Sequence, residues 1–122
     1  MVQQPGTITP YFTVDDADLF LQFISDLFDA KVVKDDRHPN GKVQHARALI
    51  GDSLIMLNES SKDYTATYQQ MHIYVSDADA SFAKAIEIGA EAIMEPNLRP
   101  HGDRMAGIKD PCGNIWWMAS KV

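Results

Sequence analysis

The chain has 122 residues, of which 45% are hydrophobic and 23% charged, a composition typical of one globular domain with a single core. Its net charge of −6 comes without any run of basic residues, which argues against nucleic acid or an anionic membrane as a partner. No apolar run is long enough to span a bilayer, and the N-terminal stretch lacks the pattern of a signal peptide. Because Cys112 is the only cysteine, no intrachain disulfide can form, and we expect a cytoplasmic protein.

The first half of the chain predicts a strand, a helix and three further strands. Residues 8–14 alternate and are rich in β-branched and aromatic side chains, which favours a strand. Asp15 or Asp16 can cap a helix that ends near Phe28, because the apolar residues between them recur at helical spacing. Three short strands are expected at 30–34, 43–50 and 53–59, with a turn at residues 38–41.

The second half predicts the same order of elements. Residues 60–67 are polar and aperiodic, so we interpret them as a linker. A strand is expected at 68–75 and a helix at 77–88, which Gly89 would end in a left-handed conformation. A loop at residues 97–103 and a tight turn at 110–113 separate the remaining strands, which we expect at 91–95, 105–109 and 114–120.

Two internal matches support a duplication. The stretch that begins at Val14 recurs from Val75, 61 residues later, and the stretch from Gly51 recurs from Gly113, 62 residues later. The sequence therefore predicts an α+β fold in which one domain, residues 1–122, contains two βαβββ units at about 8–59 and 68–121.

Residues 102–117 resemble the C-terminal motif of the glyoxalase and bleomycin-resistance proteins, which belong to the vicinal oxygen chelate superfamily. Thr9-Pro10-Tyr11 and Phe28-Asp29-Ala30-Lys31 are similar to the first half of its PhnB-like branch, where a glycine is usual in place of Asp29. The resemblance implies a half-open curved sheet that cups a ligand, with the helices behind it. It also implies a homodimer.

Catalytic members of that superfamily hold a metal on the first and last strand of each unit. Carried over onto this chain by register, those positions hold Thr9, Ile55, Gln70 and Trp117. A divalent ion needs three or more nitrogen, oxygen or sulfur donors, and these side chains do not supply them. We therefore predict neither a metal site nor any other cofactor.

Strand alternation predicts what lines the cup instead, because successive side chains point to opposite faces. Tyr11 and Thr13 share one face of the first strand, and the same rule assigns cup-facing residues in the second unit. Arg47, Asp103 and Arg104, together with His45, are candidates for the rim. The predicted ligand-binding residues are Tyr11, Thr13, Arg47, Ile55, Gln70, His72, Tyr74, Asp103, Arg104 and Trp117.

Three functional hypotheses follow, and no catalytic residue is predicted. We favour a binding protein that holds a small aromatic or amphipathic molecule in the cup without a metal. The second hypothesis is a metal-dependent lyase, isomerase or dioxygenase with displaced ligands such as His45, His72 or Glu95. The third is a dimeric domain whose cup has no ligand. The residues leave open whether the protein is an enzyme.

Overall fold

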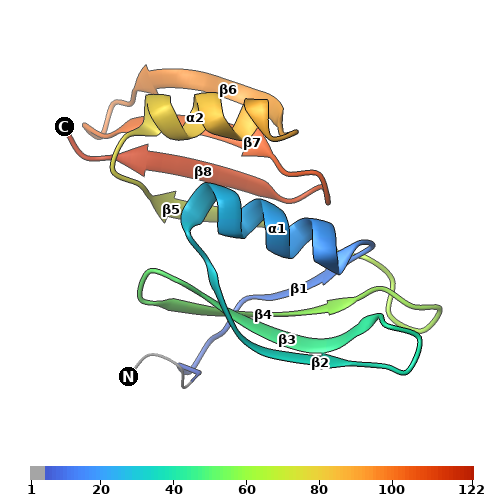
Figure 1. The fold of residues 1–122 in the computed structure, drawn as a ribbon. Helices are drawn as coiled ribbons and strands as arrows, with labels where there is room; N and C mark the ends of the chain where they lie inside the picture. Colours follow the sequence, from blue (N-terminus) through green and yellow to red (C-terminus); the bar gives the residue numbers. More distant parts are fainter. Residues whose placement is uncertain (1–4) are drawn as a thin grey trace. The chain divides into compact units, whose positions relative to one another are not determined.

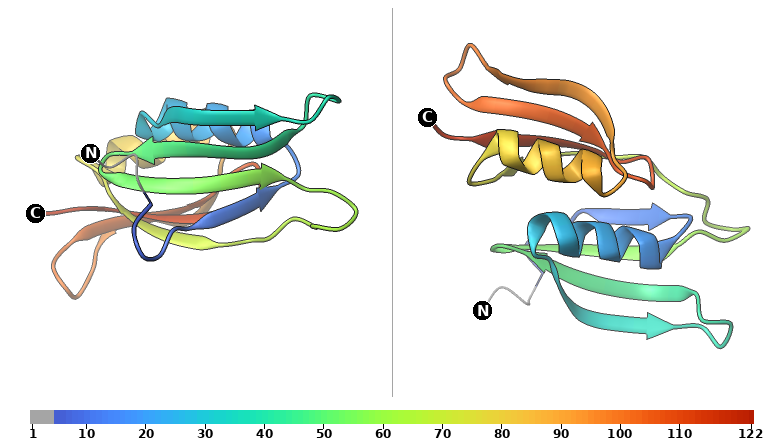
Figure 2. Two further views of the ribbon diagram at one scale, coloured as in Figure 1. Left: turned by 90° about the horizontal axis from the view of Figure 1, so that it is seen from below. Right: turned by 45° about the horizontal axis from the view of Figure 1, so that its top comes forward.

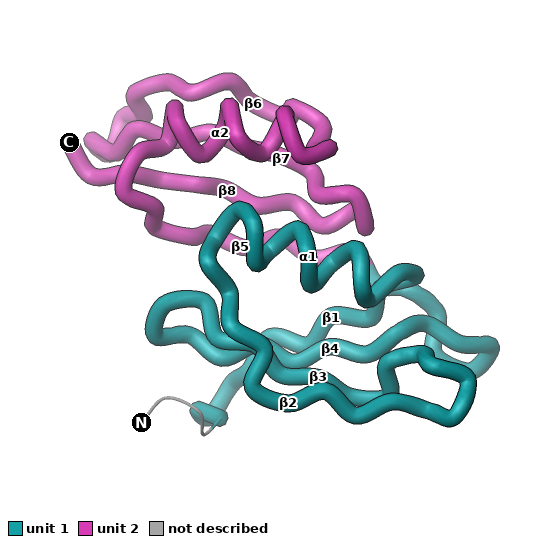
Figure 3. Tube along the Cα trace, viewed as in Figure 1, with its two compact units in different colours: residues 1–67 teal, residues 68–122 magenta. Residues whose placement is uncertain are grey.

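The computed structural model describes residues 5–122, so the first four residues of the stretch in which we looked for a signal peptide lie outside the described part. The chain divides into two compact units, one ending at Thr67 and the other beginning at Tyr68 (Figure 3). Each unit contains one helix and one four-stranded sheet. Neither of the helices among residues 5–122 has the length and apolarity needed to cross a bilayer.

The first unit is a complete βαβββ motif. Its elements are β1 (Tyr11–Val14), α1 (Ala17–Phe28), β2 (Lys31–Arg37), β3 (Val43–Ile50) and β4 (Ser53–Glu59). The strand order is β1-β4-β3-β2, in which β1 runs parallel to β4 and the other neighbours are antiparallel (Figure 1). The first strand, β1, therefore lies at one edge of the sheet. The last strand, β4, lies next to it inside the sheet.

The second unit repeats this topology. Its elements are β5 (Gln70–Tyr74), α2 (Ala78–Glu87), β6 (Glu91–Leu98), β7 (Arg104–Lys109) and β8 (Ile115–Ser120). The order β5-β8-β7-β6, with β5 parallel to β8, matches that of the first unit strand for strand. The predicted fold of two βαβββ units is confirmed.

Proline positions account for two strand limits that differ from prediction. β1 begins at Tyr11 rather than at residue 8, and the carbonyl of Pro10 accepts a hydrogen bond from Met56 N at 2.9 Å just before the strand. β6 continues past Pro96 to Leu98, although we expected a loop from residue 97. Proline cannot donate to the ladder, and the pairing shifts register between Met94 and Asn97 to pass it.

The helix ends follow the predicted chemistry. The carboxylates of Asp16 and Asp77 accept hydrogen bonds from Leu19 N and Ala80 N, so each helix has an aspartate N-cap. After α1, Asp29 adopts a left-handed conformation with φ of 55°, and after α2 Gly89 has φ of 111°. The chain thus reverses at both helix ends in the way that the sequence indicates.

Each helix packs on one face of its own sheet (Figure 2). In the first unit, Phe12 of β1 and Phe20 of α1 are fully buried, with ring centroids 5.1 Å apart. In the second unit, Ile108 and Trp116 are cross-strand partners on the buried face, and Ala85 of α2 is also buried. The opposite face of each sheet carries no helix of its own unit, and we call it the open face.

The turn before β8 is organised around a buried carboxylate. Asp110 is 3% exposed, and its Oδ1 accepts from the backbone N–H of Cys112 and Asn114 at 2.8 and 3.0 Å. Its Oδ2 accepts from the indole Nε1 of Trp116 at 2.8 Å. Gly113 N also donates to Asp110 O at 2.9 Å, which confirms the predicted tight turn.

Candidate functional site

Alternation along β1 and β5 places the predicted residues on the open faces. Phe12 and Val14 are fully buried toward α1, so Tyr11 and Thr13 point to the other side of the sheet. On β5 the exposed residues Gln70, His72 and Tyr74 alternate with less exposed neighbours. The strand parity predicted from the sequence is correct for both strands.

A hydrogen-bonded chain crosses the open face of the first unit. The hydroxyl of Tyr11 lies 3.1 Å from Nδ1 of His45, and Nε of Arg47 donates to Nε2 of the same ring at 3.3 Å. Since a guanidinium can only donate, Nε2 is the acceptor, and the neutral ring carries its proton on Nδ1 and donates it to the Tyr11 oxygen. Nearby, the hydroxyl of Thr13 donates to Oδ1 of Asn58 at 2.7 Å.

The environment of His45 favours this neutral ring. Partial burial is the largest effect that lowers the pKa of His45, followed by the charges of Arg47 and Lys34, while Asp36 acts in the opposite direction. Asp36 is engaged by Lys34 at 3.2 Å. The imidazole therefore serves as an acceptor that orients Arg47 rather than as a second cation.

The open face of the second unit carries an aromatic group, which we call the Trp117 cluster: Gln70, His72, Tyr74 and Trp117. The indole Nε1 of Trp117 donates to Oε1 of Gln70 at 2.9 Å. The rings of His72 and Tyr74 meet edge to face with centroids 4.9 Å apart, and Nζ of Lys121 lies 5.0 Å from the Tyr74 centroid. Because β5 and β8 pair His72 with Trp117, all four side chains lie on two adjacent strands.

Ile55 is not part of the open face, and this prediction was wrong. Ile55 pairs with Ala48 and is 4% exposed on the side of α1, whereas Met56 pairs with Tyr11. The error arose because the sequence match between Gly51 and Gly113 implied equal turns. Two residues connect β3 to β4, but five residues connect β7 to β8, so the strands correspond at an offset of 61 and Met56 is the counterpart of Trp117.

The two rim candidates of the second unit do not join the Trp117 cluster. Nε and Nη2 of Arg104 donate to the carboxylate of Asp79, in the first turn of α2, at 2.6 and 3.0 Å. Arg104 therefore lies on the helix side of the sheet. Asp103 lies 3.8 Å from Nε2 of His101 on the loop before β7. Arg104 thus contacts α2 and Asp103 contacts a loop residue.

The donor set does not fit the metal that the superfamily implies. With Met56 in place of Ile55, the four positions hold threonine, a thioether, an amide and an indole, and the amide oxygen of Gln70 already accepts from Trp117. Within residues 5–122, no three His, Cys, Asp or Glu side chains converge in a way that could hold an ion.

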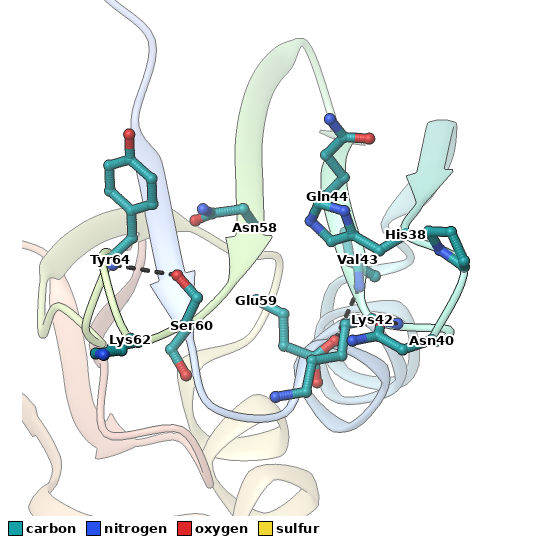
Figure 4. Close-up of a pocket in the computed structure, with 12 residues that line it drawn as sticks. His38, Asn40, Lys42, Val43, Gln44, Asn58, Glu59, Ser60, Lys62 and Tyr64 are labelled. Carbon is teal, nitrogen blue, oxygen red and sulfur yellow. Dashed lines mark hydrogen bonds between the residues drawn. The ribbon is translucent and has the colours of Figure 1, made fainter.

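A polar pocket that the sequence did not predict lies at one end of the first sheet (Figure 4). It has a volume of about 770 Å³, and in Figure 4 Tyr64 and Lys62 lie on one side of it while His38 and Asn40 lie on the other. The polar turn at 38–41 and the polar stretch at 60–67 were the only signals for it. The remaining lining residues are Pro39, Lys42, Val43, Gln44, Asn58, Glu59, Ser60 and Ser61.

The acidic residue of this pocket has a structural role. Oε1 of Glu59 accepts from Val43 N at 2.9 Å, and Oε2 accepts from Ala17 N, at the start of α1, at 3.4 Å. The carboxylate thus ties β4 to β3 and to the positive end of the helix. Since Tyr64 is the only tyrosine, phenylalanine or tryptophan that lines this pocket, we take the open faces as the candidate site.

The geometry defines a protein of two βαβββ units whose open sheet faces carry aromatic and hydrogen-bonding groups. Residues 6–118 match the family model of the glyoxalase/bleomycin resistance protein/dioxygenase superfamily. The chain belongs to this superfamily, as the sequence resemblance predicted. An uncharacterised protein of Mycobacterium bovis is 30% identical to it over 126 residues, which cover 94% of this chain and 83% of the relative.

Two solved structures show the same fold. TioX from Micromonospora sp. ML1 has a TM-score of 0.76 at 20% identity, covering 96% of this chain and 97% of TioX. The PhnB protein of Bacillus cereus has a TM-score of 0.72 at 20% identity, covering 94% of this chain and 99% of that one. At such identities the likeness concerns the fold, and function rests on the side chains of the site.

Proposed function

We propose that the protein binds a small planar aromatic or amphipathic molecule on the open faces of its sheets, without a resident metal. The observation that carries this proposal is the Trp117 cluster. Gln70, His72 and Tyr74 are exposed, and they share the sheet face with Trp117. Large aromatic side chains that serve only for packing are more often buried, so exposed ones indicate a binding surface.

The cluster combines the two features that a ligand site needs. Its rings offer flat apolar surface, and each aromatic contact adds about 0.5–1.5 kcal/mol beyond area burial. The His72 imidazole and the Tyr74 hydroxyl offer hydrogen bonds that can orient a ligand. Tyr74 is 58% exposed, so a ligand can contact its side chain without a conformational change. After the entropic costs of association, we expect micromolar affinity at best.

Titration with a non-emissive planar compound tests this proposal. 4-Nitrobenzamide is neutral, flat and a quencher of indole emission, so binding next to Trp117 should reduce tryptophan fluorescence in a saturable manner. Collisional quenching by free compound would instead give a linear response without saturation. A linear response for this and for related flat compounds would contradict ligand binding on the open face.

Two further properties belong to the same proposal. We expect a homodimer, because β2 and β6 end their own sheets and the seven residues of β2 are all exposed. Val32 and Val33 add exposed apolar surface to that edge. We also place the protein in the cytoplasm, since its single cysteine, Cys112, suits a reducing compartment.

A further inference from the structure

The arginine side chains differ in the groups that accept their hydrogen bonds. Arg37 donates to Asp18 and Asp35, and Arg104 donates to Asp79. Arg47 donates through Nε to the neutral His45, and among residues 5–122 no carboxylate lies within ion-pair distance of it. A half-buried guanidinium thus lies on the open face with its charge uncompensated.

His45 fixes the direction of this guanidinium. Because Nε of Arg47 donates to Nε2 of the ring at 3.3 Å, the two terminal amino groups are not used by His45. These terminal groups form a planar fork whose geometry matches a carboxylate or a similar oxyanion. His45 is in turn held by Tyr11 at 3.1 Å, so the orientation is set by two hydrogen bonds in series.

An apolar side chain, Met56, lies next to Arg47 on the neighbouring strand. The register pairs Arg47 with Met56 and Met56 with Tyr11, so the three side chains form a row across β3, β4 and β1, which we call the Arg47 row. Adjacent strands are about 4.8 Å apart, which puts the backbones of Tyr11 and Arg47 about 10 Å apart along the row. The Tyr11 ring extends toward β3, where its centroid lies 5.8 Å from that of His45. A thioether between them is a favourable surface for an aromatic ring.

We infer that the Arg47 row binds the oxyanion of an aromatic acid, with the carboxylate on the Arg47 fork and the ring over Met56 toward Tyr11. This inference rests on the proposed function and specifies the chemical class of its ligand. Lys34, opposite Arg47 on β2, adds positive charge to the same face, although Asp36 engages it at 3.2 Å. The chain as a whole has a net charge of −6, so the positive charge of Arg47 and Lys34 is confined to this patch.

A pair of nearly isosteric probes tests the inference. 4-Nitrobenzoate and 4-nitrobenzamide differ in charge but hardly in shape, so their affinities report the contribution of the carboxylate. We expect the native protein to bind the benzoate at least tenfold more tightly by calorimetry. In ¹⁵N-resolved spectra, the Nε–H signal of Arg47 should shift with the benzoate and much less with the benzamide. The spectra require no variant and show directly whether the side chain is involved.

Variants then assign the preference to one residue. Arg47→Gln should abolish the tenfold preference, and Arg47→Lys should retain only part of it because lysine keeps the charge without the fork. Arg99→Gln is the matched control, since Arg99 is also partnered by a neutral group, Asn97, at 3.0 Å. It should leave the preference unchanged.

The outcomes separate this inference from the proposed function. Equal affinity for both probes with saturable quenching of Trp117 would overturn the oxyanion site while the aromatic binding face stands. Loss of the preference in Arg99→Gln, or an unshifted Arg47 signal, would also overturn it. If neither probe binds in the calorimeter, both the oxyanion site and the aromatic binding face are contradicted.

Discussion

The indole of Trp117 lies directly against the backbone of Gly107. A Cβ atom at position 107 would be 2.4 Å from Cζ3 and 2.7 Å from Cε3 of that ring, far inside contact distance. The two residues are cross-strand partners on β7 and β8. The absence of a side chain at Gly107 thus allows the ring to lie over the open face, where its Nε1 reaches Gln70.

Gly107→Ala should therefore displace the indole. Overpacking costs about 1–3 kcal/mol of unfolding free energy, and the displaced ring should also lose its hydrogen bond to Gln70. In a Trp117→Ala background the same substitution should be close to neutral, because the clashing ring is gone. Urea unfolding of the four proteins measures the coupling, and an equal effect of Gly107→Ala in both backgrounds would show that the ring does not depend on Gly107.

Asp110 predicts a distinctive pH dependence. Burial is the largest effect that raises the pKa of Asp110 above its usual 3.8, and it outweighs the hydrogen bonds from Trp116, Asn114 and Cys112. A group whose pKa is raised by folding adds stability below its unfolded pKa, and this stability is lost as the pH rises through the folded value. The unfolding free energy of the native protein minus that of Asp110→Asn should thus fall as the pH rises above 3.8.

Urea unfolding at a series of pH values checks this difference. Asp18 and Asp79 have lowered pKa values because of Arg37 and Arg104, but both proteins contain them, so their effects cancel. A difference that stays constant or grows with pH would mean that the three N–H donors stabilise the carboxylate more than burial destabilises it.

Metal content should be low in the purified protein. Thr9, Met56, Gln70 and Trp117 leave too few donors for a closed coordination sphere. Without a histidine tag, elemental analysis should find well below one equivalent of zinc, iron, nickel or manganese. Near-stoichiometric metal that is lost in His72→Ala but retained in the control His38→Ala would support the alternative of a metal-dependent enzyme.

The protein should be a dimer in solution. Exposed Val32 and Val33 on β2 provide apolar surface at a sheet edge, where unpaired backbone groups favour association. Light scattering at tens of micromolar protein should give twice the mass of the 13.6 kDa chain. A mass equal to that of one chain would contradict the dimer, and each polypeptide would then form its ligand-binding faces alone.

The sequence predicted those features that depend on local alternation or capping. The helix cap at Asp16 and the faces of Tyr11 and His72 were correct, because each follows from neighbours within a few residues. The loop predicted from residue 97 began too early, since the register shift by which β6 passes Pro96 leaves no local signal.

Features that depend on long-range register were predicted less well. Ile55 was assigned to the wrong face because turn lengths, which the glycine match conceals, set the register of β4. Arg104 was misplaced because its partner, Asp79, lies 25 residues away on a helix. The chain from Tyr11 through His45 to Arg47 joins β1 to β3 across β4, and no local pattern indicates it.

Tryptophan emission during titration with 4-nitrobenzamide, compared between Trp117→Phe and Trp116→Phe, tests the binding face most directly. Trp116 is 2% exposed and bonded to Asp110, whereas Trp117 lies on the open face. Saturable quenching should disappear in Trp117→Phe and persist in Trp116→Phe. Quenching that persists in Trp117→Phe and disappears in Trp116→Phe, or no saturable quenching in the native protein, would contradict ligand binding at the Trp117 cluster.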